Sequence, residues 1–188
     1  MKVIAFNGSA RKKGNTYQSL QVVLEVLNNE GIETELVQLA DKDISHCLGC
    51  YKCAGKKKCV THDDDLNDLV DMIVKADGIL LGSPTYFANA SSKMKALIDR
   101  SGIISKVNGD LYKRKVGAAV VAVRRQGACH VFSSLNYFFL INQMVVPGSS
   151  YWNLAIGKDP GDVKDDDEGI QTFKNLGKNM AWLLKKLK

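Results

Sequence analysis

The 188-residue chain is long enough for one domain with a full core, and its composition, 45% hydrophobic and 24% charged, is that of a globular protein. No apolar stretch reaches the ~20 residues of a membrane span, and the N-terminal apolar run is too short for a signal peptide, so we expect a cytoplasmic protein with no membrane partner. The net charge is +6, but the lysines are scattered and accompany no nucleic-acid-binding pattern. We therefore expect no nucleic acid partner and favour acidic ones, such as an anionic cofactor or an acidic electron-transfer protein.

Short apolar runs alternate with segments of helical periodicity along the whole chain. Strands are predicted at residues 3–6, 33–39, 78–82, 116–123 and 144–146, and helices at about 20–27, 66–74, 91–98, 131–142 and 170–187. This order predicts an α/β fold, with a five-stranded parallel sheet inside a three-layer α/β/α sandwich. No linker or repeat is visible, so residues 1–188 should form a single domain. Two long loops are expected, a cysteine-rich one at about 41–65 and another at about 148–168, and loops of this length are usually functional.

Four of the five cysteines lie in the run HCLGCYKCAGKKKC, at Cys47, Cys50, Cys53 and Cys59. This spacing lets one loop direct four thiolates at a single cubane iron–sulfur cluster. Structural zinc fits less well, because it usually takes two cysteine pairs a dozen or more residues apart. A reducible Cys-x-x-Cys pair and four reduced bystander thiols remain as alternatives. Cys129 stands apart and is expected to be a spectator.

Ligands of open parallel sheets bind beyond the carboxyl ends of the strands, so the loops that follow the strands should carry the function. The first such loop offers hydroxyls, an amide, a guanidinium and unhindered backbone N–H groups at Ser9, Arg11, Gly14, Asn15 and Thr16. These groups suit a phosphate monoester at a helix N-terminus. The loop lacks the Gly-Lys-Ser/Thr of an NTP-binding loop and the Gly-x-Gly-x-x-Gly of a dinucleotide site. A glycine-rich turn with a capping threonine is the alternative.

The loop after the third predicted strand carries Pro84, Thr85, Tyr86, Phe87 and Asn89. Its two aromatic side chains are able to pack against a planar ring, and its amides are able to hydrogen-bond the polar edge of that ring. The alternative is that both aromatic residues are buried and only pack in the core. After the fourth strand, Gly127 permits close approach of the backbone to a ring.

With the loop motifs and the cysteine run together, the chain resembles the flavodoxin-like NAD(P)H-dependent FMN reductases, and most closely their iron–sulfur flavoprotein branch. The resemblance covers essentially the whole chain and implies a doubly wound sheet. It also implies FMN held by the two loops, a 4Fe–4S cluster on the four cysteines, and a homodimer or homotetramer. Relatives often carry Gly-Gly where this chain has Gly127-Ala128. Tyr151 and Trp152 are the anchors expected at a subunit contact, and a self-packed surface loop is the alternative.

The resulting hypothesis is an FMN-dependent oxidoreductase that passes electrons from a ferredoxin-like or nicotinamide donor to a small acceptor such as a quinone, oxygen or peroxide. No catalytic side chain is named, because the flavin itself carries the chemistry. Lys56, Lys57 and Lys58 are expected to offset the charge of the cluster and to dock an acidic donor. The alternatives are a cluster-free NAD(P)H-dependent FMN or quinone reductase and a non-catalytic carrier of the flavodoxin type.

Overall fold

The structure is a computed structural model that describes residues 1–187. Five parallel strands in the order β2-β1-β3-β4-β5 form the sheet, which is the doubly wound order of flavodoxin. The elements in chain order are β1 (Lys2–Asn7), α1 (Asn15–Asn29), β2 (Glu33–Gln38), the 3-10 turn η1 (Leu39–Asp41), α2 (Leu66–Lys75), β3 (Gly78–Pro84), α3 (Ser92–Lys106), β4 (Val116–Val123), α4 (Ala128–Ile141), β5 (Leu154–Ile156), the 3-10 turn η2 (Asp162–Asp165) and α5 (Asp167–Leu187). The predicted α/β fold is confirmed.

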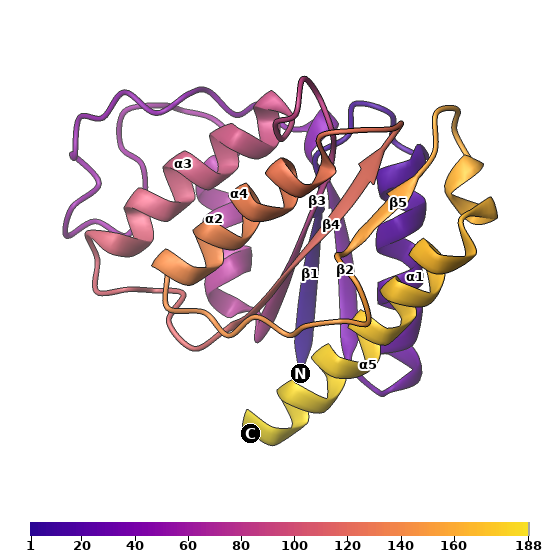
Figure 1. Cartoon of the computed structure of the whole chain (residues 1–188). Coiled ribbons are helices and arrows are strands. Elements are labelled where there is room, and N and C mark those ends of the chain that lie inside the picture. Colours follow the sequence, from indigo (N-terminus) through magenta and orange to yellow (C-terminus); the bar gives the residue numbers. More distant parts are fainter. Residues whose placement is uncertain (188) are drawn as a thin grey trace.

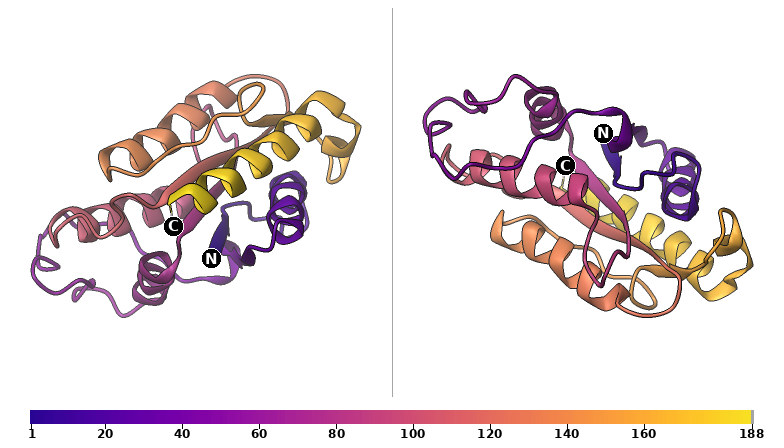
Figure 2. Two further views of the ribbon diagram at one scale, coloured as in Figure 1. Left: turned by 90° about the horizontal axis from the view of Figure 1, so that it is seen from below. Right: turned by 90° about the horizontal axis from the view of Figure 1, so that it is seen from above.

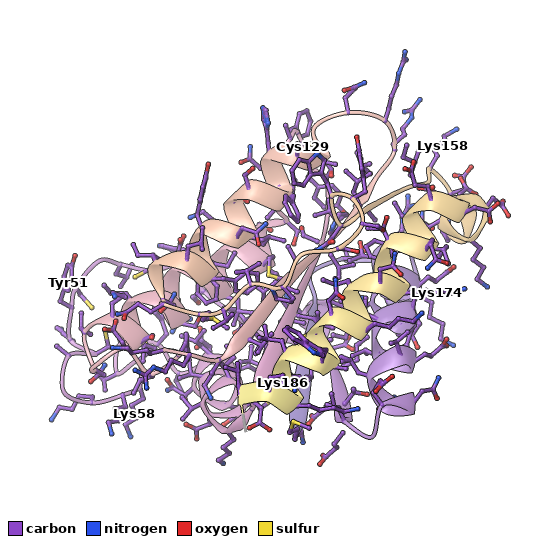
Figure 3. All side chains as sticks on the ribbon, turned by 60° about the horizontal axis from the view of Figure 1, so that its bottom comes forward. Tyr51, Lys58, Cys129, Lys158, Lys174 and Lys186 are labelled. Carbon is purple, nitrogen blue, oxygen red and sulfur yellow. The ribbon has the colours of Figure 1, made fainter. Side chains whose placement is uncertain are left out.

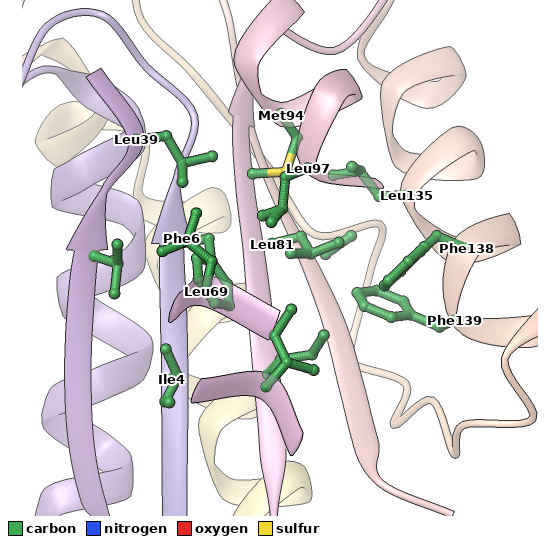
Figure 4. Packing of buried hydrophobic residues seen from close by; sticks show 14 of the residues in the cluster. Ile4, Phe6, Leu39, Leu69, Leu81, Met94, Leu97, Leu135, Phe138 and Phe139 are labelled. Carbon is green, nitrogen blue, oxygen red and sulfur yellow. The ribbon is translucent and has the colours of Figure 1, made fainter. Parts of the chain in front are cut away.

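The helices cover both faces of the sheet, as the three-layer prediction requires. Helices α1 and α5 lie on one face and α2, α3 and α4 on the other (Figure 1). Each face has its own core, because β1, β3 and β4 alternate buried apolar side chains between the two sides. On the α2–α4 side, Phe6 and Leu81 of the sheet pack with Leu97 of α3 and Phe139 of α4 (Figure 4). In residues 1–187 no helix has the length and apolar character needed to cross a bilayer.

The prediction of the last strand at 144–146 is wrong. Val145 forms only an isolated parallel bridge with Val116, and β5 lies ten residues later, inside the segment predicted as a loop. Val145 N donates to Lys115 O, and Val145 O accepts from Gly117 N. The next amide of this ladder belongs to residue 147, and Pro147 has no N–H to donate. Pairing therefore stops there, and the chain returns to β4 only at Leu154, which pairs with Val121.

The cysteine-rich segment lies outside the sandwich. Within the described chain, no helix or strand occurs between η1 and α2, and both views of Figure 2 place this segment at the opposite end of the molecule from the loop between β5 and α5. The segment is anchored by Asn108, in the turn directly after α3, whose Nδ2 donates to Cys53 O at 3.0 Å and whose Oδ1 accepts from Lys57 N at 3.1 Å. Since Asn108 Nδ2 also donates to Ile104 O at 2.8 Å, the same side chain joins this long irregular segment to the last turn of α3.

Candidate functional site

A cavity of about 200 Å³ opens at the carboxyl edge of the sheet, where the loops after β1, β3, β4 and β5 converge. Polar and cationic side chains line one side of it, and Pro84, Tyr86 and Ala122 supply apolar surface. The lining residues are Ser9, Arg11, Asn15, Thr16, Pro84, Thr85, Tyr86, Ala122, Val123, Arg124, Gly157 and Lys158. Seven of the eleven residues predicted for cofactor binding therefore meet around one cavity.

The loop after β1 is held by side chains buried beneath it. Asn7 Oδ1 accepts from Ser9 N at 3.1 Å, and Asn7 Nδ2 donates to Gln38 Oε1 at 2.6 Å. Gln38 Nε2 in turn donates to Ser9 O at 2.6 Å. Helix α1 begins directly after this loop at the N-cap Gly14, which offers no side-chain acceptor to the first turn. The first N–H groups of α1 are thus available to an anion in the cavity.

The loop after β3 folds into a tight hairpin whose tip points away from the cavity. Tyr86 and Asn89 exchange two backbone hydrogen bonds of 2.9 Å, and the intervening Phe87 and Ala88 have φ of 48° and 59°. Both central residues are left-handed, as in a type I′ turn, although neither is glycine. The Phe87 ring is fully exposed. The structure thus brings Tyr86, but not Phe87 or Asn89, to the cavity wall.

Gly127 supports the hairpin and does not line the cavity. Its φ is 90°, and a β-carbon at this position would lie 2.9 Å from Ala88 Cβ and 3.3 Å from Thr85 Cγ2. The loop after β4 therefore packs directly against the loop after β3. Gly14 also contributes backbone only, as the N-cap of α1.

Sequence reasoning missed Arg124, Gly157 and Lys158. Arg124 is the first residue after β4, and ligands of open parallel sheets bind beyond the carboxyl ends of the strands, so its position alone could have indicated a role in the site. Gly157 and Lys158 follow β5, so the misplaced last strand hid them. Asn15 Oδ1 accepts from Gly161 N at 2.8 Å and ties this loop to the start of α1.

All four clustered cysteines line a second, smaller cavity of about 30 Å³. Thr61, His62 and Arg100 line it as well. Cys50 Sγ lies 3.3 Å from Thr61 Oγ1, a contact that lowers the pKa of the Cys50 thiol. Burial and the neighbouring cysteines raise the pKa of Cys53. Nowhere in residues 1–187 do three or more His, Cys, Asp or Glu side chains stand as a ready-made site for a metal ion.

The donors around this cavity fit an electron-rich sulfur cluster. Arg100 Nη2 and His62 Nε2 are buried and have no hydrogen-bond partner. Unpaired buried donors are uncommon in proteins and usually indicate a missing acceptor. A cubane cluster binds one thiolate at each of four iron corners and presents sulfur acceptors between them. The four thiols and the unpaired guanidinium N–H of Arg100 match that requirement.

The chain is similar to known proteins both in sequence and in fold. A family model described as NADPH-dependent FMN reductase matches residues 1–159. An iron–sulfur flavoprotein of Methanocaldococcus jannaschii is 40% identical, over 100% of both chains. RosB, solved with bound 8-demethyl-8-formylriboflavin-5'-phosphate, superposes with a TM-score of 0.82 at 20% identity, over 100% of this chain and 80% of its own. An archaeal flavodoxin superposes with a TM-score of 0.64 at 17% identity, over 98% of this chain and 99% of its own.

The two solved structures share the fold, whereas the family model and the Methanocaldococcus relative show descent along nearly the whole chain. The family consists of FMN-dependent oxidoreductases. The chain therefore belongs to the NADPH-dependent FMN reductase family, in its branch of iron–sulfur flavoproteins.

Proposed function

We propose that this protein is an FMN-dependent oxidoreductase that takes electrons through a 4Fe–4S cluster on Cys47, Cys50, Cys53 and Cys59 and reduces a small acceptor such as a quinone, oxygen or peroxide. The observation that carries the proposal is the convergence of all four thiols on one cavity, which is also lined by the unpaired buried guanidinium nitrogen of Arg100. When bound, FMN exchanges one or two electrons and the cluster exchanges one, so the pair converts a one-electron supply into a two-electron reduction.

The residues of the larger cavity suit FMN. Ser9, Thr16 and the first N–H groups of α1 would hold its phosphate, with Arg11 supplying a charge-assisted bond. Tyr86 and Pro84 would pack against the flat ring. Hydrogen bonds with Asn7 and Gln38 hold the loop after β1, and Asn15 ties the loop after β5 to the start of α1, so the phosphate would be held at a fixed point of the sheet edge.

The cysteine-rich segment suits an acidic electron donor of the ferredoxin type. Lys52, Lys56, Lys57 and Lys58 are all exposed on it, together with the ring of Tyr51. Tyr51 and Lys58 project outward at the end of the molecule opposite Lys158 (Figure 3). A cationic surface over the four cysteines would steer an anionic partner to the point of electron entry.

We also propose a homodimer or homotetramer. Trp152 is 55% exposed, and its ring lies 5.9 Å from that of Phe132 of α4, centroid to centroid, at an angle of 45°. Tyr151 lies beside Trp152 and is 57% exposed. Large exposed aromatics of this kind are enriched in subunit contacts. The mass in solution from sedimentation velocity checks this assembly.

Cysteine substitution in anaerobically purified protein tests the proposed function. The wild type should contain FMN, iron and acid-labile sulfide. Substituting any one of the four clustered cysteines by alanine should lower the iron sharply and leave FMN bound, because FMN and the cluster occupy separate loops. Cys129→Ala is the matched control, since Cys129 is exposed at the start of α4 and does not line the cysteine cavity.

The outcome separates the proposed function from its nearest alternative. Electron delivery from a one-electron donor should fail in the four variants, while chemical reduction of the flavin persists. Wild type with FMN but no iron, and equal turnover in all five variants, contradicts the proposal. That result favours a cluster-free NAD(P)H-dependent reductase, for which Arg124 and Lys158 would bind the dinucleotide phosphates at the cavity.

A further inference from the structure

Arg100 is an unusual feature of the wall of the cysteine cavity. It lies in α3, is only 2% exposed, and is the largest of the fully buried side chains. Its Nη1 donates to Asp64 Oδ2 and, at 3.2 Å, to Ser45 O. Within residues 1–187 it is the only lysine or arginine that lines the cavity of the four cysteines.

Asp64 fixes the guanidinium from beneath. Its Oδ2 also accepts from Ser45 N at 3.0 Å, and its Oδ1 accepts from Leu66 N at 3.3 Å, so the carboxylate is anchored at the end of the cysteine-rich segment. Removing two charges from water is costly, and a pair of apolar side chains of similar volume often stabilises a fold equally well. The buried pair therefore calls for an explanation beyond stability.

The second guanidinium nitrogen provides that explanation. Nη2 is buried without a partner, although Nη1 is fully used. Arg100 and the four clustered cysteines line the same cavity, so sulfur atoms surround the space that this nitrogen borders. Leaving a charged donor unpaired in a buried site costs more than an ordinary lost hydrogen bond. A sulfur acceptor in this cavity would satisfy it.

We propose that Arg100 donates from Nη2 to a sulfur atom of the four-cysteine site and thereby makes the cluster easier to reduce, with Asp64 holding the guanidinium in place. The inference rests on the proposed function. Reduction adds negative charge to the cluster, and a donor aimed at its sulfur stabilises the reduced form more than the oxidised form. Inside a protein this interaction is stronger than in water.

Exposed lysines are poorer candidates for this role. Lys56, Lys57 and Lys58 carry more total charge, but all three side chains are exposed to solvent. Water and salt screen such charges strongly, whereas a buried donor is screened little. Among the described cations, the one buried at the cavity should thus influence reduction of the cluster more than the three that surround it on the surface.

The test compares two substitutions at the ion pair with a matched surface control. Arg100→Lys retains a cation able to bond Asp64 but lacks the second nitrogen of the fork. The double variant Arg100→Gln with Asp64→Asn removes both buried charges, so neither is left unpaired. The control, Lys58→Gln, removes one positive charge that is exposed on the cysteine-rich segment. In each anaerobic holoprotein, the fraction of reduced cluster is measured against potential, with the bound FMN as an internal reference.

Both substitutions at the ion pair should lower the equilibrium constant for cluster reduction about tenfold, equivalent to about 59 mV for one electron. Lys58→Gln should change it less than about twofold, and the FMN potential should stay constant, because its cavity is built from other loops. Arg100→Lys should retain its iron, since the contact with Asp64 persists.

An unshifted cluster potential in both variants, or an equal shift in Lys58→Gln, overturns the proposal while leaving the proposed function intact. Loss of iron from both variants in a folded protein also overturns it, because Arg100 would then only clamp the loop. Wild type without iron and sulfide overturns the proposed function and this inference with it.

Discussion

Replacing Gly127 by alanine tests whether the loops after β3 and β4 are packed as one support beside the larger cavity. The substitution introduces two separable costs. Gly127 has φ of 90°, where an L-residue is strained, and the new methyl group would meet Ala88 Cβ at 2.9 Å and Ala88 Cα at 3.0 Å. Gly109 offers a matched control, because its φ is 86° but nothing lies within 4 Å of a β-carbon there.

The two costs have different magnitudes. A left-handed backbone costs an L-residue about 1–2 kcal/mol, which is the whole loss expected for Gly109→Ala. Overpacking adds about 1–3 kcal/mol, so Gly127→Ala should lose about 2–5 kcal/mol. The backbone carbon of Ala88 cannot rotate away as a flexible side chain would, which makes the contact difficult to relieve.

Urea unfolding of FMN-free protein measures both losses without a contribution from ligand binding. A separate titration should show that FMN binds more weakly to Gly127→Ala and normally to Gly109→Ala, because only the first separates the two loops. Equal losses of stability in the two variants, or undiminished FMN binding by Gly127→Ala, would refute the described packing.

Two further predictions follow from single side chains. Arg11→Ala should weaken FMN binding by roughly 10- to 100-fold, since a hydrogen bond to a charged group contributes about 1.5–3 kcal/mol. Lys13→Ala, in the same exposed loop, is the control and should leave FMN binding unchanged. Fluorescence titration of the FMN-free proteins measures both affinities, and equal affinities in the two variants would show that Arg11 is merely solvated. Burial raises the pKa of Asp64, but its bonds to Arg100 and the backbone outweigh burial and lower the pKa below 3.8. The ionised Asp64 carboxylate therefore stabilises the folded protein fully above the pKa that Asp64 has in the unfolded chain. This stabilisation is lost as the pH falls through the pKa that Asp64 has in the folded protein. The stability difference between wild type and Asp64→Asn should accordingly shrink in acid urea titrations, and a pH-independent difference would contradict this assignment.

The sequence predicts best those parts of the site that follow long buried strands. The uninterrupted apolar runs of β1, β3 and β4 leave little choice of element or register, so the loops after them are located correctly. The three-residue β5 carries too little pattern to be recognised, and Gly157 and Lys158 were missed with it. Pro147 was the available signal, because a proline cannot continue the ladder that Val145 begins.

Local sequence patterns also do not predict the burial of a side chain whose partner lies far away in the sequence. Arg100 occupies a helix in which a charged residue normally faces solvent, and only Asp64, 36 positions earlier, explains its burial. Phe87 and Ala88 are a second case. Nothing in this dipeptide predicts a turn with two positive φ angles, so the exposed position of the Phe87 ring follows from the fold around it.

The interruption at Pro147 has a consequence for how the molecule avoids self-association through its sheet. An edge strand with a continuous row of free amides is a template for pairing with other chains. Here the β4 edge is covered at one end by Val145 and at the other by three residues of β5, with a bulging segment between them. At the opposite edge, β2 presents the charged side chains of Glu33 and Glu35, both paired with Lys2. The pairing along the β4 edge is thus too short and interrupted to nucleate cross-β aggregation, and the β2 edge carries too much charge to do so.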